Sequence, residues 1–342
     1  MRGCFLLPTL VVLVALLGSG CKEREQTEAK GSELARQGGI EIVVETDAEQ
    51  RDKLYAALLK RVEGSASPKA TLHKEGSSRV VIRIPGATDI KRYKRLMTER
   101  AFIAWMLVAE DYLLLDESNT WNPRRLLEVY DRAVMQLPDS GPDPSRPDDP
   151  EAIVPYKDDE GDLVNFEAFD KKLKDEALIP VETILRVYED VDRLGNTVRT
   201  PLLLRSSEDE PCVLSGDDLN PESFTVVRGS YGEPQVRFEI KTDEAKKRFE
   251  DVTGRYSSDS ENRIAVERGY RGWRLAILFD DTVLSAPTIR TKLSDGGGVI
   301  TFGSADTFGE ADLLVAQLRT GSLPRTVRVV TVRVVPPGGE AE

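Results

Sequence analysis

Residues 273–290 read WRLAILFDDTVLSAPTIR, and the stretch continues through GGG at 296–298 to LRTGSLP at 318–324. Its apolar run LAILF stops at the pair Asp280-Asp281, a combination that favours a tight turn. A second short run of β-branched and apolar residues follows at once. The stretch therefore predicts a β-hairpin with its turn at Asp280-Asp281.

The second half of the stretch predicts a third strand and a helix. The glycines at 296–298 lack the Lys-Ser/Thr of a phosphate loop and precede an apolar run, so they are interpreted as a hairpin turn into a strand at 299–302. Residues 310–319 repeat apolar side chains at helical spacing, and Gly321 is placed to end that helix. None of these patterns is a catalytic motif, so the stretch is interpreted as a structural framework.

The N-terminal part of the folded body predicts a β-α-β-β-α-β order. Strands are predicted at 40–45, 70–73, 79–84 and 101–108, with helices at 47–62 and 89–98 between them. This order is the split β-α-β arrangement of a ferredoxin-like domain. The fold class is therefore predicted as α+β, with a ferredoxin-like base and a second α+β subdomain.

Five motifs resemble the first extracytoplasmic domain, base plus head, of the SecD/SecDF protein-export subunits. They are GGIEIVVE at 38–45, VVIRIPG at 80–86, LSGDDL at 214–219, V-x-x-A-P-x-I at 283–289 and LRTGSLP at 318–324. In that family, such a domain aids late export and a membrane bundle supplies proton-driven movement. Here the chain carries no second apolar run of transmembrane length, so energy coupling to protons is not expected in this polypeptide.

The N-terminus is interpreted as a lipoprotein-type signal peptide. Arg2 gives a positive start, residues 5–17 are apolar, and Ser19 and Gly20 are the small residues expected before a lipidated Cys21. Gly18 departs from the usual lipobox Leu, so ordinary signal-peptide cleavage is the alternative. Lipidation would anchor the chain to a membrane of the bacterial cell envelope, facing the extracytoplasmic (periplasmic) side.

The resemblance and the composition together predict a domain organisation. The predicted segments are a signal peptide at 1–20, a flexible tether at 21–37, the ferredoxin-like base at 38–110, an unassigned and partly helical insertion at 111–200, a SecD-like head at 201–325, a strand at 326–335 that returns to the base, and a disordered tail at 336–342. The insertion includes a Pro/Asp-rich exposed loop at 138–150, a helix at 123–135, and segments 166–178 and 183–194 interpreted as helices or helix-strand mixtures.

Composition argues against nucleic-acid binding and against most enzyme classes. The net charge is −12, which repels phosphate. The single His73 excludes His-based triads and multi-His metal sites, and the acidic pairs at 217–218 and 280–281 are interpreted as turns and caps. Cys212, apart from the signal and lipidation cysteines, is interpreted as a buried residue, with a reactive thiol as the alternative. No enzyme, cofactor or metal is expected.

The leading functional hypothesis is a lipid-anchored module that binds exported polypeptide or a translocon partner. Exposed head strands would pair with an extended chain, and Ser285, Thr288 and Arg290 are the candidate contact residues. The alternative is a structural or assembly lipoprotein of the envelope that has the SecD-like fold but no export role. An enzyme in the unassigned insertion is the third possibility.

Overall fold

The computed structural model describes residues 33–64, 70–113, 122–138, 155–157, 163–191, 194, 196–207, 212–266, 268–301, 308–324 and 327–338. The chain divides into two compact units, Met1–Thr98 with Pro324–Glu342, and Glu99–Leu323. The signal peptide, Cys21, residues 139–150 of the Pro/Asp-rich loop and the last residues of the tail lie outside the described ranges. Within the described residues, no helix has both the length and the apolar character needed to cross a bilayer.

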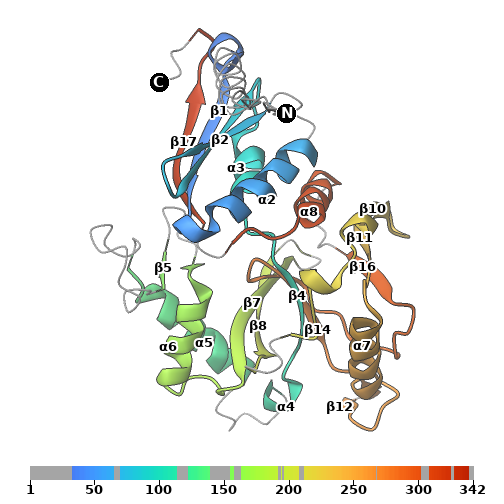
Figure 1. Ribbon diagram of the computed structural model, residues 1–342. Helices are drawn as coiled ribbons and strands as arrows, with labels where there is room; N and C mark the ends of the chain where they lie inside the picture. Colours follow the sequence, from blue (N-terminus) through green and yellow to red (C-terminus); the bar gives the residue numbers. More distant parts are fainter. Residues whose placement is uncertain are drawn as a thin grey trace, which may run out of the picture. The chain divides into compact units, whose positions relative to one another are not determined.

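The first unit is a four-stranded antiparallel sheet with two helices (Figure 1). Its elements are β1 (Gly39–Glu45), α2 (Arg51–Gly64), β2 (Thr71–Glu75), β3 (Arg79–Pro85), α3 (Ile90–Thr98) and β17 (Arg328–Val335). Their spatial order is β17-β1-β3-β2. Ile40, Ile42 and Val44 of β1 are fully buried, as are Leu54 and Leu58 of α2. The unit has the predicted β-α-β-β-α-β order once β17 is counted as its last strand.

The predicted fourth strand at 101–108 is not part of this sheet, which corrects the expected boundary of the base. β17 takes that place and pairs with β1, as predicted for the C-terminal strand. Side-chain burial gives the physical reason. All five residues of β4 (Ile103–Leu107) are buried, which requires cover on both faces, whereas most of β17 is exposed as expected of an edge strand. The tether also ends earlier than predicted, because residues 33–37 are helical and Leu34 is fully buried.

The second unit is built around the antiparallel pair β4 and β14 (Leu275–Phe279). Their sheet has the order β15-β14-β4-β9, with β15 at Thr282–Ser285 and β9 at Leu214–Ser215. Side chains alternate between two separate apolar clusters, because successive residues of a strand point to opposite faces. Trp105 and Ile277 lie in one cluster, whereas Met106 and Leu278 lie in the other. One strand pair therefore forms the wall between two cores.

The first apolar cluster lies between one face of the β4–β14 pair and the elements of the head. Its elements are β10 (Thr225–Arg228), β11 (Pro234–Glu239), α7 (Asp243–Arg255), β12 (Ile264–Val266), β13 (Gly269–Arg271), β16 (Gly297–Thr301) and α8 (Phe308–Thr320). Strands β10, β11 and β16 form a separate three-stranded antiparallel sheet. The same cluster as Val236 and Ile300 includes apolar residues of α7 and α8, namely Ala245, Phe249, Ala311, Leu314, Val315 and Leu318. Helix α8 agrees with the predicted helix at 310–319 and is followed by Gly321 at φ +81°.

The second cluster is covered by the segment that the sequence left unassigned. Its elements are α4 (Glu110–Leu113), α5 (Pro123–Met135), β5 (Tyr156–Lys157), β6 (Leu163–Val164), α6 (Phe166–Asp175), β7 (Thr183–Val191) and β8 (Thr197–Arg205). Helix α5 has the predicted bounds and begins with the Asn122 side chain accepting from the Arg125 N–H. Within the segment predicted at 183–194 as a helix or a helix-strand mixture, Thr183–Val191 form strand β7, which pairs with β8 along its whole length. The insertion is thus an integral layer of the unit.

The glycines at 296–298 are not a hairpin turn, which corrects that interpretation. Only Gly296 has a positive φ, of +66°, and β16 begins at Gly297 and pairs with β11 instead of β15. A Cβ on Gly297 would lie 2.6 Å from the carbonyl oxygen of Phe238. Glycine is therefore needed for close approach of two strands rather than for a reversal of the chain.

The predicted turn at Asp280-Asp281 is confirmed, and it also holds the start of β4. Both residues have positive φ, +47° and +68°. The Asp280 carboxylate accepts hydrogen bonds from the N–H groups of Ala101, at 2.9 Å, and Phe102, at 2.7 Å. One turn residue therefore links the two central strands at their ends.

We expect Asp280→Gly to lower the free energy of unfolding by about 2 kcal/mol, because two buried N–H groups lose their acceptor. Glycine tolerates the positive φ, so the loss reports the carboxylate and not backbone strain. Urea denaturation measures it. Asp280→Asn retains an acceptor and is expected to lose less, and Asp312→Asn on the exposed side of α8 is the control. Equal stability of the glycine variant and the native chain would contradict this role.

Candidate functional site

The three candidate contact residues lie on one segment beside β14. Ser285 is opposite Ile277 in the β15–β14 pair, and Thr288 is opposite Arg274 in an isolated bridge. The side chain of Ser285 is partly buried, whereas Thr288 and Arg290 are exposed. Ser285 therefore lies at the end of β15 and Thr288 in a bridge beside β14, and Arg290 follows two residues later on the same segment.

Most backbone groups of this segment already have partners. The Pro287 carbonyl accepts from Leu275 N–H, and Ile289 N–H donates to the Trp273 carbonyl, both at 2.9 Å. The Ile289 carbonyl accepts from Ser258 N–H at 3.2 Å. Because the bonded residues flank Thr288, the N–H and C=O of Thr288 point away from β14. Strand β7 is in contact with β15. The segment thus presents a short outward edge.

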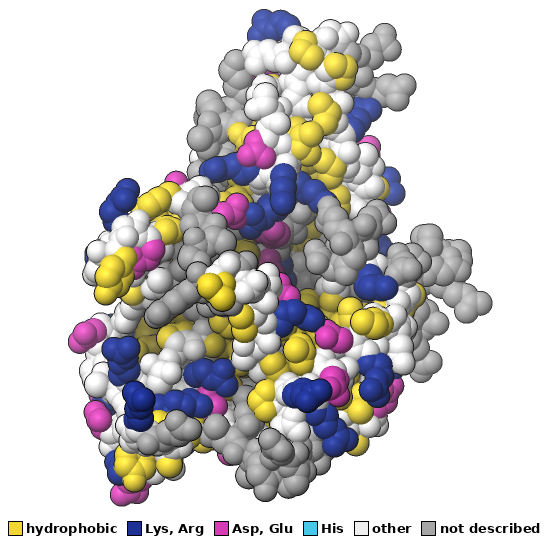
Figure 2. All heavy atoms as spheres, turned by 180° about the vertical axis from the view of Figure 1, so that it is seen from behind, with side chains coloured by type: hydrophobic (Ala, Val, Ile, Leu, Met, Phe, Trp, Pro, Cys, Tyr) yellow, Lys and Arg dark blue, Asp and Glu magenta, His cyan; other side chains and the backbone are white. Residues whose placement is uncertain are grey.

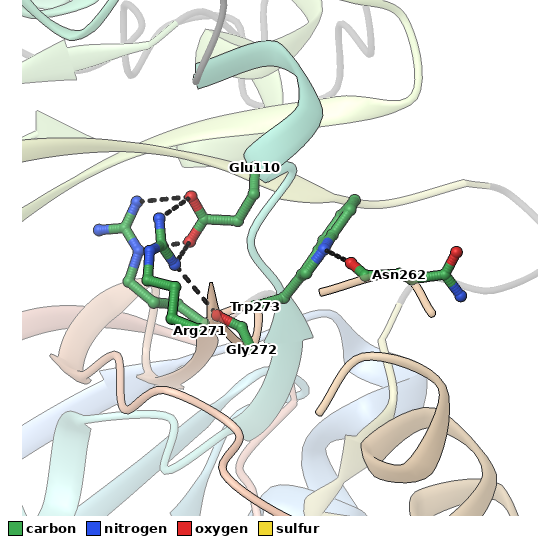
Figure 3. A network of polar contacts seen from close by, with 6 residues as sticks. Glu110, Asn262, Arg271, Gly272 and Trp273 are labelled. Carbon is green, nitrogen blue, oxygen red and sulfur yellow. Dashed lines mark hydrogen bonds and ion pairs between the residues drawn. The ribbon is translucent and has the colours of Figure 1, made fainter. Parts of the chain in front are cut away.

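A buried carboxylate anchors the chain where it enters β14 (Figure 3). Glu110 is fully buried and faces two guanidinium groups. Arg274 Nε donates to Glu110 Oε1 at 2.6 Å, and Arg271 Nη2 donates to Glu110 Oε2 at 3.0 Å. Between these arginines, the Trp273 indole N–H donates to the Asn262 carbonyl at 2.8 Å. The network fixes residues 271–274 and, through Trp273, the neighbouring segment at 287–290.

The ionisation of Glu110 depends on these arginines. Burial alone would raise the pKa of this carboxyl group, but hydrogen bonds from Arg271 and Arg274 outweigh it and hold the pKa below its usual value. A folded-state pKa below the unfolded one adds stability above the unfolded pKa. That stability is lost as pH falls through the folded pKa.

Glu110→Gln is expected to lower the free energy of unfolding at neutral pH by about 3 kcal/mol, because two arginines lose their charge partner. The variant is also expected to lose less stability on acidification between about pH 5 and pH 3, since the titrating group is gone. Denaturant unfolding at a series of pH values checks both. Glu261→Gln, at an exposed position, is the control, and an unchanged slope in the Glu110 variant would contradict the assignment.

The acidic pairs are engaged in local structure. Arg186 is buried and donates to Asp170 at 2.9 Å and to Asp281 at 2.7 Å. Burial raises the pKa of Asp170 above its usual value. In the second pair, the Asp218 carboxylate accepts from Ser215 N–H at 2.8 Å and closes a capping box. These contacts support the interpretation of the pairs as turn and cap residues.

The remaining candidate groups do not converge on one site. His73 lies half-buried on β2, where burial lowers its pKa. Cys212 is partly buried against the second cluster, and burial raises the pKa of its thiol to about 11, so the reactive thiolate is disfavoured. Among the residues that the structure describes, no three His, Cys, Asp or Glu side chains are grouped to hold a metal ion. On the face drawn in Figure 2, basic and acidic side chains are interspersed.

One cavity of about 150 Å³ lies in the second unit. Its walls include Phe102, Phe224 and Leu318, with Asp217 and Lys241 also lining it. Sites for drug-sized ligands usually measure about 300 Å³ or more. The cavity is therefore small for a cofactor, and its apolar walls are part of the junction between β4, α8 and the loop before β10.

The chain is similar in sequence to known SecD and SecDF proteins. Residues 191–325 match the family model described as SecDF, P1 head subdomain. The chain is 33% identical over 162 residues to the protein translocase subunit SecD of Calditerrivibrio nitroreducens, covering 46% of this chain and 27% of the relative. It is 23% identical over 316 residues to the subunit SecDF of Thermus thermophilus, covering 89% of this chain and 31% of the relative. The chain thus spans less than a third of the length of these two relatives.

Two solved structures also align with most of the chain, at low identity. A structure described as SecDF in a super-membrane-facing form aligns over 88% of this chain and 31% of its own, with 23% identity and a TM-score of 0.49. A structure described as a membrane component SecDF that enhances protein export aligns over 86% of this chain and 99% of its own, with 22% identity and a TM-score of 0.47. The match of residues 191–325 to the head model and the similarity to SecD and SecDF sequences show that the chain resembles an extracytoplasmic part of these subunits.

Proposed function

We propose that this SecD-like domain is a lipid-anchored, non-enzymatic module that binds translocating polypeptide or a translocon partner during protein export. The observation that carries the proposal is the segment that follows β15, where Thr288 forms a bridge beside β14 and the side chains of Thr288 and Arg290 are exposed; it lies inside the matched head region. An outward N–H and C=O on an exposed strand can hydrogen-bond to the backbone of any extended chain. The names of the relatives, protein translocase subunits, suggest what that chain would be.

The charged groups of the second unit support a binding role over catalysis. Glu110, Asp170, Asp218 and Asp280 each hold backbone or arginine partners that maintain the fold. General acid-base catalysis requires groups that reach a substrate in a shared cleft. Carboxylates committed to turns, caps and buried ion pairs are poorly placed for that task.

Photocrosslinking tests the polypeptide-binding role. A photoreactive amino acid at Ser285, Thr288 or Arg290 of the full chain, expressed in its host, is expected to capture exported polypeptides, because these side chains lie on the proposed contact segment. Mass spectrometry of the adducts identifies the captured chains. The control is the same probe at Glu244, an exposed position on α7.

Each outcome of that experiment has a clear meaning. Exported chains captured at 285–290 and not at Glu244 support the proposal. Adducts with translocon subunits and no exported chains reject the polypeptide-binding form and support binding of a translocon partner. Adducts with other envelope components alone, or no adducts at any of the three positions, reject the export role and favour a structural or assembly lipoprotein.

Lipidation at Cys21 is tested separately. We expect the native chain to incorporate a labelled fatty acid and to sediment with membranes, because several acyl chains give stable anchoring. Cys21→Ala should abolish the label and release the protein into the soluble extracytoplasmic fraction. A native chain that is processed but carries no label would instead indicate ordinary signal-peptide cleavage.

A further inference from the structure

Strand β16 is the outer strand of the three-stranded head sheet, whose order is β10-β11-β16 (Figure 1). The direction of its backbone groups follows from the register. Ile240 N–H donates to the Gly296 carbonyl at 2.7 Å, and Phe238 and Val236 are opposite Gly298 and Ile300. In an antiparallel pair, hydrogen-bonded and non-hydrogen-bonded pairs alternate. The N–H and C=O of residues 297, 299 and 301 therefore point away from β11, toward the open edge.

Three successive outward positions make this edge longer than the one beside β14. The register of β16 with β11 continues without a bulge over all five residues. Ile300 is fully buried, whereas Val299 is 46% exposed and Thr301 is exposed. The buried Ile300 side chain thus fixes the strand, and among the described strands β16 pairs along one edge alone, with β11. Such an edge is already in the conformation that a pairing strand requires, so binding needs little ordering of the protein.

The strand also lacks the usual protection of an edge. Natural edge strands commonly carry charges, proline or bulges that prevent pairing with other chains. β17 is one of the two outer strands of the sheet in the first unit. It has Arg328, Arg333 and a register shift in its pairing with β1. β16 reads GGVIT and has none of these features. Of these two edge strands, β17 is protected against pairing with another chain, whereas β16 is available for it.

The chemistry of the edge selects its ligand. A row of alternating N–H and C=O groups is complementary to another extended backbone. Gly297 and Gly298 have no side chains, so the side chains of an incoming segment meet little steric hindrance at this end of β16. Backbone recognition without side-chain pockets tolerates many sequences. The edge therefore suits an unfolded polypeptide of mixed sequence more than one defined partner.

We propose that the outer edge of β16, through residues 297, 299 and 301, binds an extended segment of unfolded polypeptide as an added strand of the head sheet. This inference rests on the proposed polypeptide-binding function and assigns it to an edge separate from the segment at 285–290. The sequence predicts a strand at 299–302 that follows a glycine turn, but it places the candidate contact residues only at 285, 288 and 290.

A backbone variant tests the mode of binding. Val299→Pro removes one outward N–H and leaves the bonds to β11 intact, since proline is tolerated at an outward edge position. Val299→Ala retains the N–H and is the matched control. With reduced, carboxymethylated α-lactalbumin as a permanently unfolded, fluorescently labelled probe, anisotropy is expected to show about fivefold to tenfold weaker binding to the proline variant. The alanine variant should bind within about twofold of the native chain.

A second measurement does not depend on the folding of the proline variant. A photoreactive amino acid at Val299 of the full chain is expected to capture exported polypeptides, whereas the same probe at Lys247, exposed on α7, should not. Capture at residues 285–290 with none at Val299 overturns this inference and leaves the proposed function standing. Capture at neither place overturns both. Capture of a second copy of the chain, or equal probe affinities of the proline and alanine variants, also overturns this inference.

Discussion

The pairing of β4 with β14 is the constraint on which the rest of the second unit depends. Every residue of both strands is buried, so each face of the pair must be covered by other elements. The head elements cover one face, and α5, α6, β7 and β8 cover the other. Burial of apolar surface contributes about 25 cal/mol per Å². Two cores that share one wall therefore stabilise each other, because loss of the wall would expose both.

Charged side chains fix the ends of this wall. Asp280 binds the backbone at the start of β4, and Glu110, just after the end of β4, holds the arginines before β14. Asp281 extends the same arrangement to β7 through Arg186. Each buried carboxylate has an arginine or backbone N–H as partner, which offsets the cost of its desolvation. Asp280, Asp281 and Glu110 are therefore part of the framework that holds β4 and β14.

The proposed function depends on the edges of the sheets. The cavity lined by Phe102, Phe224 and Leu318, in the described part of the second unit, has a volume of about 150 Å³. The exposed backbone lies at the strand beside β14, around Thr288, and along β16. Both edges belong to the region that matches the SecDF head. Recognition through backbone hydrogen bonds requires no catalytic group, and it accommodates the varied sequences of unfolded chains.

The local elements could be predicted from the sequence alone. The LAILF strand, the Asp280-Asp281 turn, the bounds of helix α5 and the α+β class all follow from short-range patterns of apolar residues and turn chemistry. The contact role of Ser285, Thr288 and Arg290 stays a prediction. The β16 edge could not be predicted in this way, since Gly297 and Gly298 favour a turn when only their neighbours are considered.

The partners of the strands were decided only by the tertiary structure. Residues 101–108 have the pattern of a base strand, but β4 joins β14, and the distant β17 completes the base sheet. The backbone groups of all strands are chemically alike, so hydrogen bonding itself does not specify which pairs form. Which strands pair depends on how much apolar side-chain surface the pairing buries. That buried surface is set only when segments far apart in the sequence come together.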